Sequence, residues 1–583
     1  MANDSLKSRH LFLSEHQPLA PEGPEARARA DLAVAVIGPP EDAKVEGKVD
    51  GKTSAPPPAG KDAPARLSRL VRIDAAAPRV GDDVCLDEDG NRAGGDVPVA
   101  CPSAPLGRFH LGQQMQNAAK TADGIVLSGL DAWYRLGRHG AGFCPTCEMA
   151  LTEAIRKTYG EHVQPFRVLE ALRAPGLPAQ QRPFFGLKES LRLSEPLTAA
   201  KLSILRARDE ARKSRNLELP VFGSVKELSA LALALAPHLD GLLFSLPDGE
   251  PLHAVLPLLA ARAAMGERPA IAVLPGELAP ARVGLYAALA AACDVDVMLE
   301  AGASEAARKA LQADRQFQAL LRERYRPMAP LADVFVFLSP RADHLAEGVH
   351  LKATQTSVAA LASANLQLSV KLGKVPVRST QGDAALLLVA GLASVPSDQE
   401  AALRHFVTSG GDLVLVGPST VVDDEGRALR PLFPEAKAGL ERVGEGRIWT
   451  IVASAQGELP QGPALEQLVL RAARELMGRR KPQLSISGRG ALWARAYLDP
   501  ERKLDVHLTN LELKDAGSEA PTAQGMLLTI AGAAAGGGRS GYWFAPGSTV
   551  DKDGDRLSLN PSGFSVSCVL PGVGRCALLS VPR

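Results

Sequence analysis

Long apolar runs and an excess of charge of either sign are both missing from this chain. No stretch approaches the roughly eighteen consecutive apolar residues of a membrane span, and the N-terminus lacks the apolar segment of a secretory signal. The 66 basic residues nearly balance the 65 acidic ones, so no basic surface for nucleic acid or an anionic membrane is indicated. We therefore expect a soluble, cytoplasmic protein without nucleic-acid or membrane partners.

Cysteines and aromatic residues are also scarce. Seven cysteines, an odd number, do not make a disulfide framework in a chain of 583 residues, so reduced thiols or a small metal site are expected. Aromatic residues make up 4% of the chain, which weighs against a sugar site built mainly from stacked rings.

Apolar runs of strand length alternate with helix-like patterns over the first half of the chain. Such alternation predicts a parallel α/β architecture, and eight strands is the number that a TIM barrel needs. A Lys-, Gly- and Pro-rich stretch at 41–66 reads as a flexible insertion. We expect 1–66 to be a partly flexible N-terminal segment with the first barrel strand, and 67–328 to be the TIM-barrel-like domain. The eight predicted strands are 31–38, 69–74, 97–101, 123–129, 219–225, 239–246, 269–276 and 295–302.

Two further units follow the barrel. Buried-type strands and helices alternate over 329–480, which predicts a flavodoxin-like or amidotransferase-like α/β domain. This region contains no cysteine, which excludes a glutaminase nucleophile there. Short alternating runs with turn signals over 481–583 predict a C-terminal antiparallel β-sandwich, in which His507 lies on one face of a strand as a structural residue.

Five local segments stand in a particular order along the chain: CPSAP at 101–105, ADGIVLSG at 122–129, FCPTC at 143–147, ADVFVFLS at 332–339 and FVTSGGDLVLVG at 406–417. In this order they resemble glycoside hydrolase family 42, the three-domain β-galactosidases. The resemblance spans about 95–583 and implies a carbohydrate partner, no required cofactor, and a middle domain of the β-galactosidase trimerisation type. That domain would join subunits into a homo-oligomer, a trimer or a dimer.

Glycoside hydrolysis needs two carboxyl groups about 5 to 10 Å apart. The resemblance implies an acid/base after the fourth strand, usually a Glu after Asn, and a Glu nucleophile at the end of the seventh. Our count makes 123–129 the fourth strand, which ends at Ser128 with Asp131 as the nearest acid. The seventh strand ends beside Glu277, and Glu300 is its rival if the count is off by one.

Each of these carboxylates also has a simpler interpretation as a solvated loop residue or a helix cap. Asp248 and Glu250, after the sixth predicted strand, are further candidates of the same kind. The sequence thus supports two hypotheses: a glycoside hydrolase that uses two carboxylates, or a catalytically inactive relative that binds sugar or serves as a scaffold. The missing Asn-Glu pair favours the second hypothesis.

Cys144 and Cys147 have the spacing of a zinc knuckle. Tetrahedral zinc takes four ligands, and Cys101 with Cys85 or His139 could complete a closed structural site. Members of the resembled family carry a cysteine cluster near this loop. The simpler interpretation is a pair of reduced thiols at the start of a helix.

Overall fold

The structure, a computed structural model, describes most of the chain between Leu70 and Pro582. The predicted strand at 31–38, the insertion at 41–66, His139 and Asp248 lie outside the described residues. The ranges outside the description are 1–69, 79–83, 88–90, 93–97, 134–141, 161–163, 165–169, 171, 173–184, 248, 314, 326, 346–347, 377–385, 393–394, 396, 418–419, 422–429, 435–436, 453–458, 479–480, 500–502, 513–521, 532–538, 547–553 and 583.

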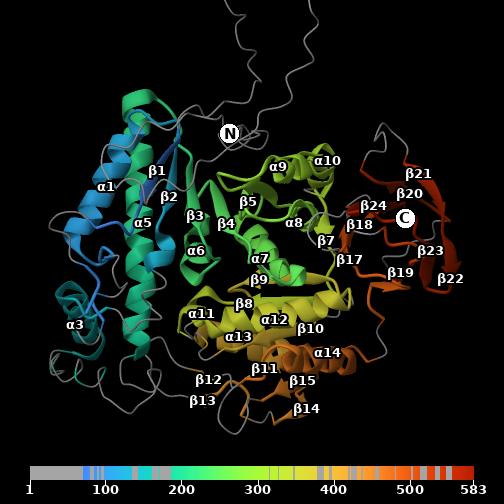
Figure 1. Ribbon diagram of the computed structural model, residues 1–583. Helices are drawn as coiled ribbons and strands as arrows, with labels where there is room; N and C mark the ends of the chain where they lie inside the picture. Colours follow the sequence, from blue (N-terminus) through green and yellow to red (C-terminus); the bar gives the residue numbers. More distant parts are fainter. Residues whose placement is uncertain are drawn as a thin grey trace, which may run out of the picture.

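Six strands of the first half form one sheet in chain order (Figure 1). Each strand runs parallel to the next, and Val, Leu and Ile dominate, as they do in mostly buried parallel strands. These strands coincide with six of the eight predicted ones. They are β1 (Leu70–Asp74), β2 (Gly124–Ser128), β3 (Val221–Val225), β4 (Gly241–Ser245), β5 (Ala270–Leu274) and β6 (Asp296–Leu299).

The predicted strand at 97–101 is wrong. Ala100 makes only an isolated antiparallel bridge with Val84, and β1 pairs directly with β2. Pro98 has no N–H to donate, which disfavours this run as an inner strand of a sheet. The count that made 123–129 the fourth strand therefore included one strand too many, and β2 is the second strand of the described sheet.

Helices connect and cover these strands. Long α5 lies beside α1, where an ion pair joins Arg108 to Glu195 and Gly112 lets the two helices approach closely (Figure 1). The helices are α1 (Pro105–Ala119), α3 (Pro145–Tyr159), α5 (Phe185–Arg215), α6 (Ala230–Leu235), α7 (Val255–Met265), α8 (Pro280–Ala292), α9 (Glu305–Ala313) and α10 (Arg315–Tyr325), with short 3-10 turns at Ala236–His238 and Pro251–Ala254.

A second six-stranded sheet has the order β14-β15-β11-β10-β8-β9. It is parallel apart from the β14–β15 hairpin, and it confirms the predicted strands at 332–339, 384–392 and 412–417. Its strands are β8 (Val334–Leu338), β9 (Leu368–Leu372), β10 (Leu386–Ala390), β11 (Asp412–Val416), β14 (Gly439–Val443) and β15 (Gly446–Ile451), with a separate pair β12 (Thr420–Val421) and β13 (Arg430–Pro431). Its helices are α11 (Pro340–Leu345), α12 (Val349–Ser363), α13 (Ser397–Thr408) and α14 (Pro463–Met477).

The C-terminal part contains two antiparallel sheets, of four and six strands, around a common core. Leu528 and Val566 from the smaller sheet share this core with Val506 and Leu579 from the larger one, as in a sandwich. The smaller sheet contains β16 (Leu484–Ser487), β19 (Leu527–Ala531), β23 (Ser565–Val569) and β22 (Asn560–Ser562). The larger contains β21 (Asp555–Ser558), β20 (Ser540–Phe544), β24 (Cys576–Val581), β18 (Leu504–Asn510), β17 (Leu492–Leu498) and β7 (Ala329–Pro330).

The short strand β7 joins the C-terminal sheet although it precedes the second sheet in the chain. Ala329 pairs with Leu498 and Pro330 with Tyr497, both on β17. The chain therefore contributes to its last sheet before it enters its second one.

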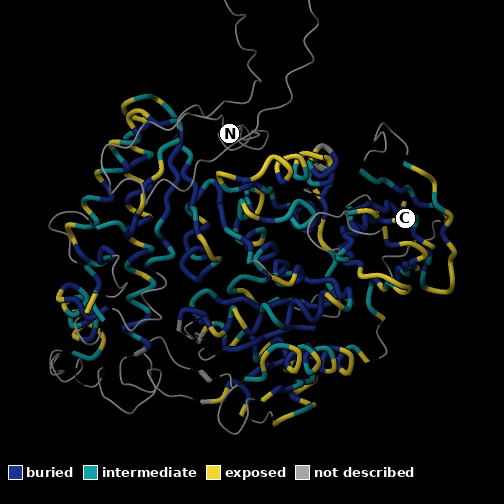
Figure 2. The backbone as a smooth tube through the Cα atoms, viewed as in Figure 1, coloured by how far each residue is buried: buried dark blue, intermediate teal, exposed yellow. Residues whose placement is uncertain are grey.

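Burial follows these layers (Figure 2). Strands of the first two sheets are mostly buried, and exposed residues gather on outer helices such as α9. None of the helices in the described part of the chain has the length and apolar character needed to span a bilayer.

Candidate functional site

The two faces of the first sheet have different surroundings. Alternate residues of its strands form a small apolar cluster of their own, whereas the intervening residues, such as Ile73, Ile125 and Val221, pack into the large core that the helices cover. We call the face of the sheet that carries this small cluster the inner face. The cluster contains Val126, Phe222, Leu243, Val273 and Met298, with Leu70 and Ile271 at its margin.

Polar side chains lie on this inner face near the carboxyl ends of the strands. Side chains two residues apart on a strand share a face, so Arg72 and Asp74 face the same way as Leu70. Ser128 is paired with Asp74 in the parallel register. Glu300 follows Met298 by two residues, just past the end of β6. The carboxyl ends of parallel strands are where α/β proteins commonly place their sites.

Ser128 is held by hydrogen bonds on both sides. The Nε of Arg72 donates to its Oγ at 3.0 Å, and that hydroxyl donates to the carbonyl oxygen of Ile73 at 3.3 Å. Ser128 is buried, while Arg72 and Asp74 are exposed. The end of β2 therefore carries a serine hydroxyl held in place by hydrogen bonds, and the charged residues Arg72 and Asp74 lie beside it on β1.

Gly129, the residue after Ser128, has a left-handed backbone with φ of 81°. A Cβ atom built there would overlap the Oδ1 of Asp74 and lie 3.0 Å from its Cγ. Only glycine fits this conformation without strain, and any side chain would displace the Asp74 carboxylate. The first position past the end of β2 is therefore closed to a carboxyl side chain.

Asp131, the predicted acid, is half-buried beyond β2. Its Oδ2 accepts a hydrogen bond from the backbone N–H of Lys226 at 2.6 Å, and Lys226 directly follows β3. The carboxylate therefore connects the segments that leave two neighbouring strands.

Glu277 and Glu300, the predicted nucleophiles, follow neighbouring strands. Glu277 is exposed in a turn that the N–H of Leu278 closes on the carbonyl of Pro275 at 3.3 Å. Glu300 is half-buried, and its N–H donates to the carbonyl of Leu274 at 2.9 Å, which extends the β5–β6 pairing by one residue. Both therefore lie at the carboxyl edge of the sheet, three or more strands from Asp131. Glu250, the further candidate, is exposed and begins a 3-10 turn.

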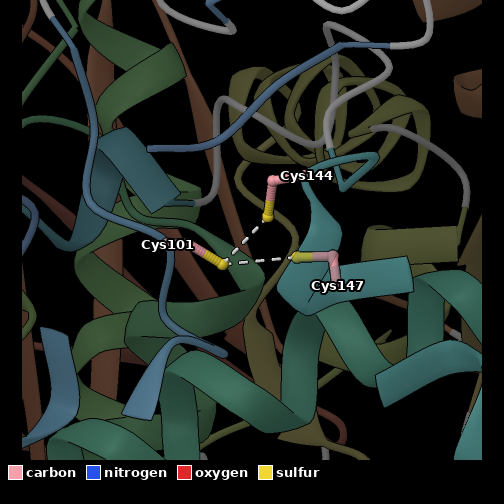
Figure 3. Close-up of side chains that lie close together, drawn as sticks. All are labelled: Cys101, Cys144 and Cys147. Atoms are coloured by element: carbon pink, nitrogen blue, oxygen red, sulfur yellow. Dashed lines mark hydrogen bonds between the residues drawn. The ribbon is translucent and has the colours of Figure 1, made fainter. Parts of the chain in front are cut away.

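The structure brings three of the predicted metal ligands together (Figure 3). The Sγ of Cys101 lies 3.4 Å from the Sγ atoms of both Cys144 and Cys147. Ligands about 2.3 Å from a tetrahedral zinc ion lie about 3.8 Å from one another, close to this spacing. Cys144 immediately precedes α3 and Cys147 lies in its first turn, so the helix fixes their separation.

The surroundings keep these thiols protonated when no metal is bound. Hydrogen bonding with Cys144 is the largest cause that raises the pKa of Cys101, and hydrogen bonding with Cys101 raises the pKa of Cys147 to about 12. Burial adds to both shifts. A metal ion would displace these protons, as it does when it binds cysteine ligands generally.

Cys85 is the described candidate for a fourth ligand. It is buried, its Sγ lies 3.7 Å from the carbonyl oxygen of Ala100, and its thiol also raises the pKa of Cys101. The donor set of three or four thiols suits a soft ion such as zinc.

Arg72 and Asp74 were missed in the sequence. The signal was present in the run RLVRID at 69–74, because two charged residues two positions apart in an apolar strand must share one face. The run was interpreted only as a strand.

Comparisons with solved structures identify the fold, whereas no protein-family model and no curated protein matches the chain. Gan42B, a GH42 β-galactosidase from G. stearothermophilus, has a TM-score of 0.57 at 12% identity over 88% of each chain. The α-L-fucosidase isoenzyme 2 from Paenibacillus thiaminolyticus has a TM-score of 0.53 at 13% identity, over 88% of this chain and 87% of its own. The β-galactosidase from Bacillus circulans sp. alkalophilus has a TM-score of 0.52 at 12% identity, over 85% and 86%. The predicted resemblance to family 42 is confirmed at the level of fold.

Proposed function

We propose that this chain hydrolyses O-glycosidic bonds of a β-galactoside-like or other oligosaccharide at the carboxyl edge of its first sheet. The observation that carries the proposal is the set of polar groups on the inner face, Asp74, Ser128 and Glu300, in a fold of the GH42 type. The first sheet then corresponds to the part of a TIM-barrel domain that holds the reacting sugar. Fold alone does not determine function, so the proposal depends on these side chains.

The mechanism would use two carboxyl groups, one protonated and one ionised. Glu277 or Glu300 is the candidate nucleophile, and Asp131 is the acid that the sequence indicates. Asp131 follows β2 and Glu277 follows β5. Two strands, β3 and β4, lie between these, just as two strands lie between the fourth and seventh strands of a barrel.

One observation favours the alternative function, a catalytically inactive relative that binds sugar or forms a scaffold. The strand tip at Ser128 has no Asn-Glu pair, and Asp74 closes the space beside Gly129 to a larger residue. In this case the protein would bind saccharides without turning them over.

We also propose a structural zinc ion bound by Cys101, Cys144 and Cys147, with Cys85 or His139 as the fourth ligand. Such an ion would join the segment before α1 to the start of α3 and would take no part in the reaction.

The remaining parts of the proposal concern organisation. We take 1–66 as the N-terminal segment, 67–328 as the glycosidase-like domain, 329–480 as a trimerisation-like domain and 481–583 as the sandwich. The middle domain would join copies into a trimer or dimer, and the cytoplasm is the proposed location.

A chromogenic screen tests the activity. The purified full-length chain is assayed on 4-nitrophenyl β-D-galactoside, β-D-glucoside and α-L-fucoside, with Glu277→Gln and Glu300→Gln beside it. Loss of about three orders of magnitude or more in one variant would identify the nucleophile, since it removes the group that bonds to the sugar. If neither variant differs in turnover from the unsubstituted chain, the nucleophile assignment is refuted. Saccharide binding without turnover by the unsubstituted chain would support the inactive alternative.

A further inference from the structure

We propose that Asp74 provides the acid/base carboxyl group of this site, delivered from β1 in place of a side chain at residue 129. This inference rests on the proposed hydrolase activity and assigns one of its two carboxyl roles. In this proposal Asp74, and not Asp131, is the acid/base.

The position of Asp74 in the sheet is the first argument. It is the last residue of β1, on the inner face, opposite Ser128 in the parallel register. The carboxyl end of a strand is where a barrel presents groups to a substrate. Asp74 is also exposed, so a ligand could reach its carboxylate.

The relation to Gly129 is the second argument. The Asp74 carboxylate fills the volume that a Cβ at residue 129 would take, with the backbone N of Ala76 3.0 Å from the same point. A carboxyl group therefore stands next to the tip of β2 although residue 129 has no side chain. The Asp74 carboxylate fits there because residue 129 is a glycine.

The hydrogen bonds around Asp74 leave part of its carboxylate available. Its Oδ1 accepts the backbone N–H of Ala76 at 3.0 Å, which fixes the orientation of the group. Within the described part of the chain, no residue donates a hydrogen bond to its Oδ2. Asp131 likewise uses one oxygen, its Oδ2, to accept the N–H of Lys226 at 2.6 Å. The two groups differ in exposure, because Asp131 is half-buried whereas Asp74 is exposed.

The chemistry balances with groups that the proposal names. Protonated Asp74 gives its proton to the glycosidic oxygen as the bond from that oxygen to C1 breaks, while Glu277 or Glu300 forms an ester with C1. Ionised Asp74 then takes a proton from water, whose oxygen bonds to C1 as the ester bond breaks. The protein returns to its starting state with one water consumed.

The test is the dependence of turnover on the leaving group, which a merely structural residue would not change. Asp74→Asn keeps an oxygen acceptor for the Ala76 N–H but cannot give up a proton. On the sugar that the unsubstituted chain cleaves fastest, we expect a loss of about 10²- to 10⁴-fold with a phenyl glycoside. The 2,4-dinitrophenyl glycoside needs little protonation, so its cleavage should fall much less. In the Asp74→Asn variant, the fall of kcat/KM at high pH that deprotonation of the acid causes should also disappear.

Gly129→Ala is the second variant, because its methyl group would displace Asp74 without removing a carboxylate. We expect the same dependence on the leaving group in the fraction that folds, as judged by circular dichroism. Asp209→Asn, a change to an exposed aspartate of α5, is the matched control and should leave turnover unchanged.

The outcomes separate the two proposals. If the unsubstituted chain cleaves none of the glycosides, the proposed hydrolase activity fails and this role for Asp74 fails with it. If the chain is active and Asp74→Asn loses both leaving groups equally, or neither, only the role of Asp74 is overturned. A leaving-group effect in Asp131→Asn and not in Asp74→Asn would return the role to Asp131.

Discussion

Arg324 and Asp505, 181 residues apart in the chain, form a two-pronged ion pair. The Nε and Nη2 of Arg324 contact both oxygens of the Asp505 carboxylate, the second at 3.0 Å, and Nη2 also donates to the Oγ of Ser580 at 2.7 Å. Asp505 is almost fully buried on β18, while Arg324 is at the end of α10 and about one-third exposed. The pair attaches the first part of the chain to the C-terminal sandwich.

The first prediction concerns this pair. Arg324→Met should lower the free energy of unfolding by about 3 kcal/mol, because it leaves a buried carboxylate without its cation. Arg322→Met is the control, since its partner Asp296 is 42% exposed and that pair should contribute about 1 kcal/mol or less. Urea unfolding of both variants measures the difference, and equal losses would contradict the prediction.

The second prediction concerns pH. His507 was predicted to be structural, and it is fully buried with its Nδ1 3.1 Å from the hydroxyl of Tyr325. Burial, and to a smaller extent Arg495, lowers the pKa of His507 to about 3. In the unfolded chain this histidine has a pKa of about 6.5, so below that pH the unfolded state binds the extra proton and stability falls as the pH drops toward 3.

A replacement that does not titrate should remove this acid sensitivity. His507→Gln should have a lower free energy of unfolding than the unsubstituted protein at pH 7.5. This difference in free energy of unfolding should be smaller by about 2 kcal/mol at pH 5. Chemical denaturation at the two pH values measures the difference. A difference that is constant or larger at pH 5 would show that His507 is protonated in the folded protein.

The third prediction concerns the thiol cluster of Cys101, Cys144 and Cys147. Protein purified without chelator should contain about one zinc ion per chain, measured by inductively coupled plasma mass spectrometry, and chelation should lower its Tm. Cys147→Ser should lose the metal because one thiolate ligand is missing. Cys293→Ser is the matched control, since that buried thiol lies outside the cluster. Metal retained by Cys147→Ser would favour simple reduced thiols.

The fourth prediction concerns Gly446, the first residue of β15. A Cβ there would overlap the carbonyl oxygens of Gly411 and Val407, which are backbone atoms that cannot turn aside. Gly446→Ala should therefore cost about 3 kcal/mol or more of stability. Gly574→Ala has open space around its Cβ and should change stability by less than about 0.5 kcal/mol. Thermal melting compares the two, and similar Tm values would refute the prediction.

The strands of the first sheet could be predicted because buried parallel strands consist of consecutive apolar residues. The run at 97–101 looked the same and failed because Pro98 has no N–H to donate to a neighbour. The grouping of Cys101 with Cys144 and Cys147 was predicted from the spacing of the two later cysteines and from the place of Cys101 at the end of the predicted strand 97–101. The group is confirmed although that strand is wrong.

The contacts that give the site its character could not be predicted from sequence. The position of Asp74 over Gly129 depends on β1 being the direct neighbour of β2, and the Asp131 bond to Lys226 depends on how two loops leave their strands. Both relations arise between segments more than fifty residues apart. Periodicity describes each segment by itself and does not give its neighbour.

The pairing of β7 with β17 has a consequence for how this protein is made. Synthesis proceeds from the N-terminus, so Ala329 and Pro330 leave the ribosome well before Leu498 and Tyr497 exist. The edge that β7 completes is therefore closed late, after the first two sheets have had time to form, since units generally fold as they emerge. A nascent chain that ends before β17 therefore lacks the strand with which Ala329 and Pro330 pair.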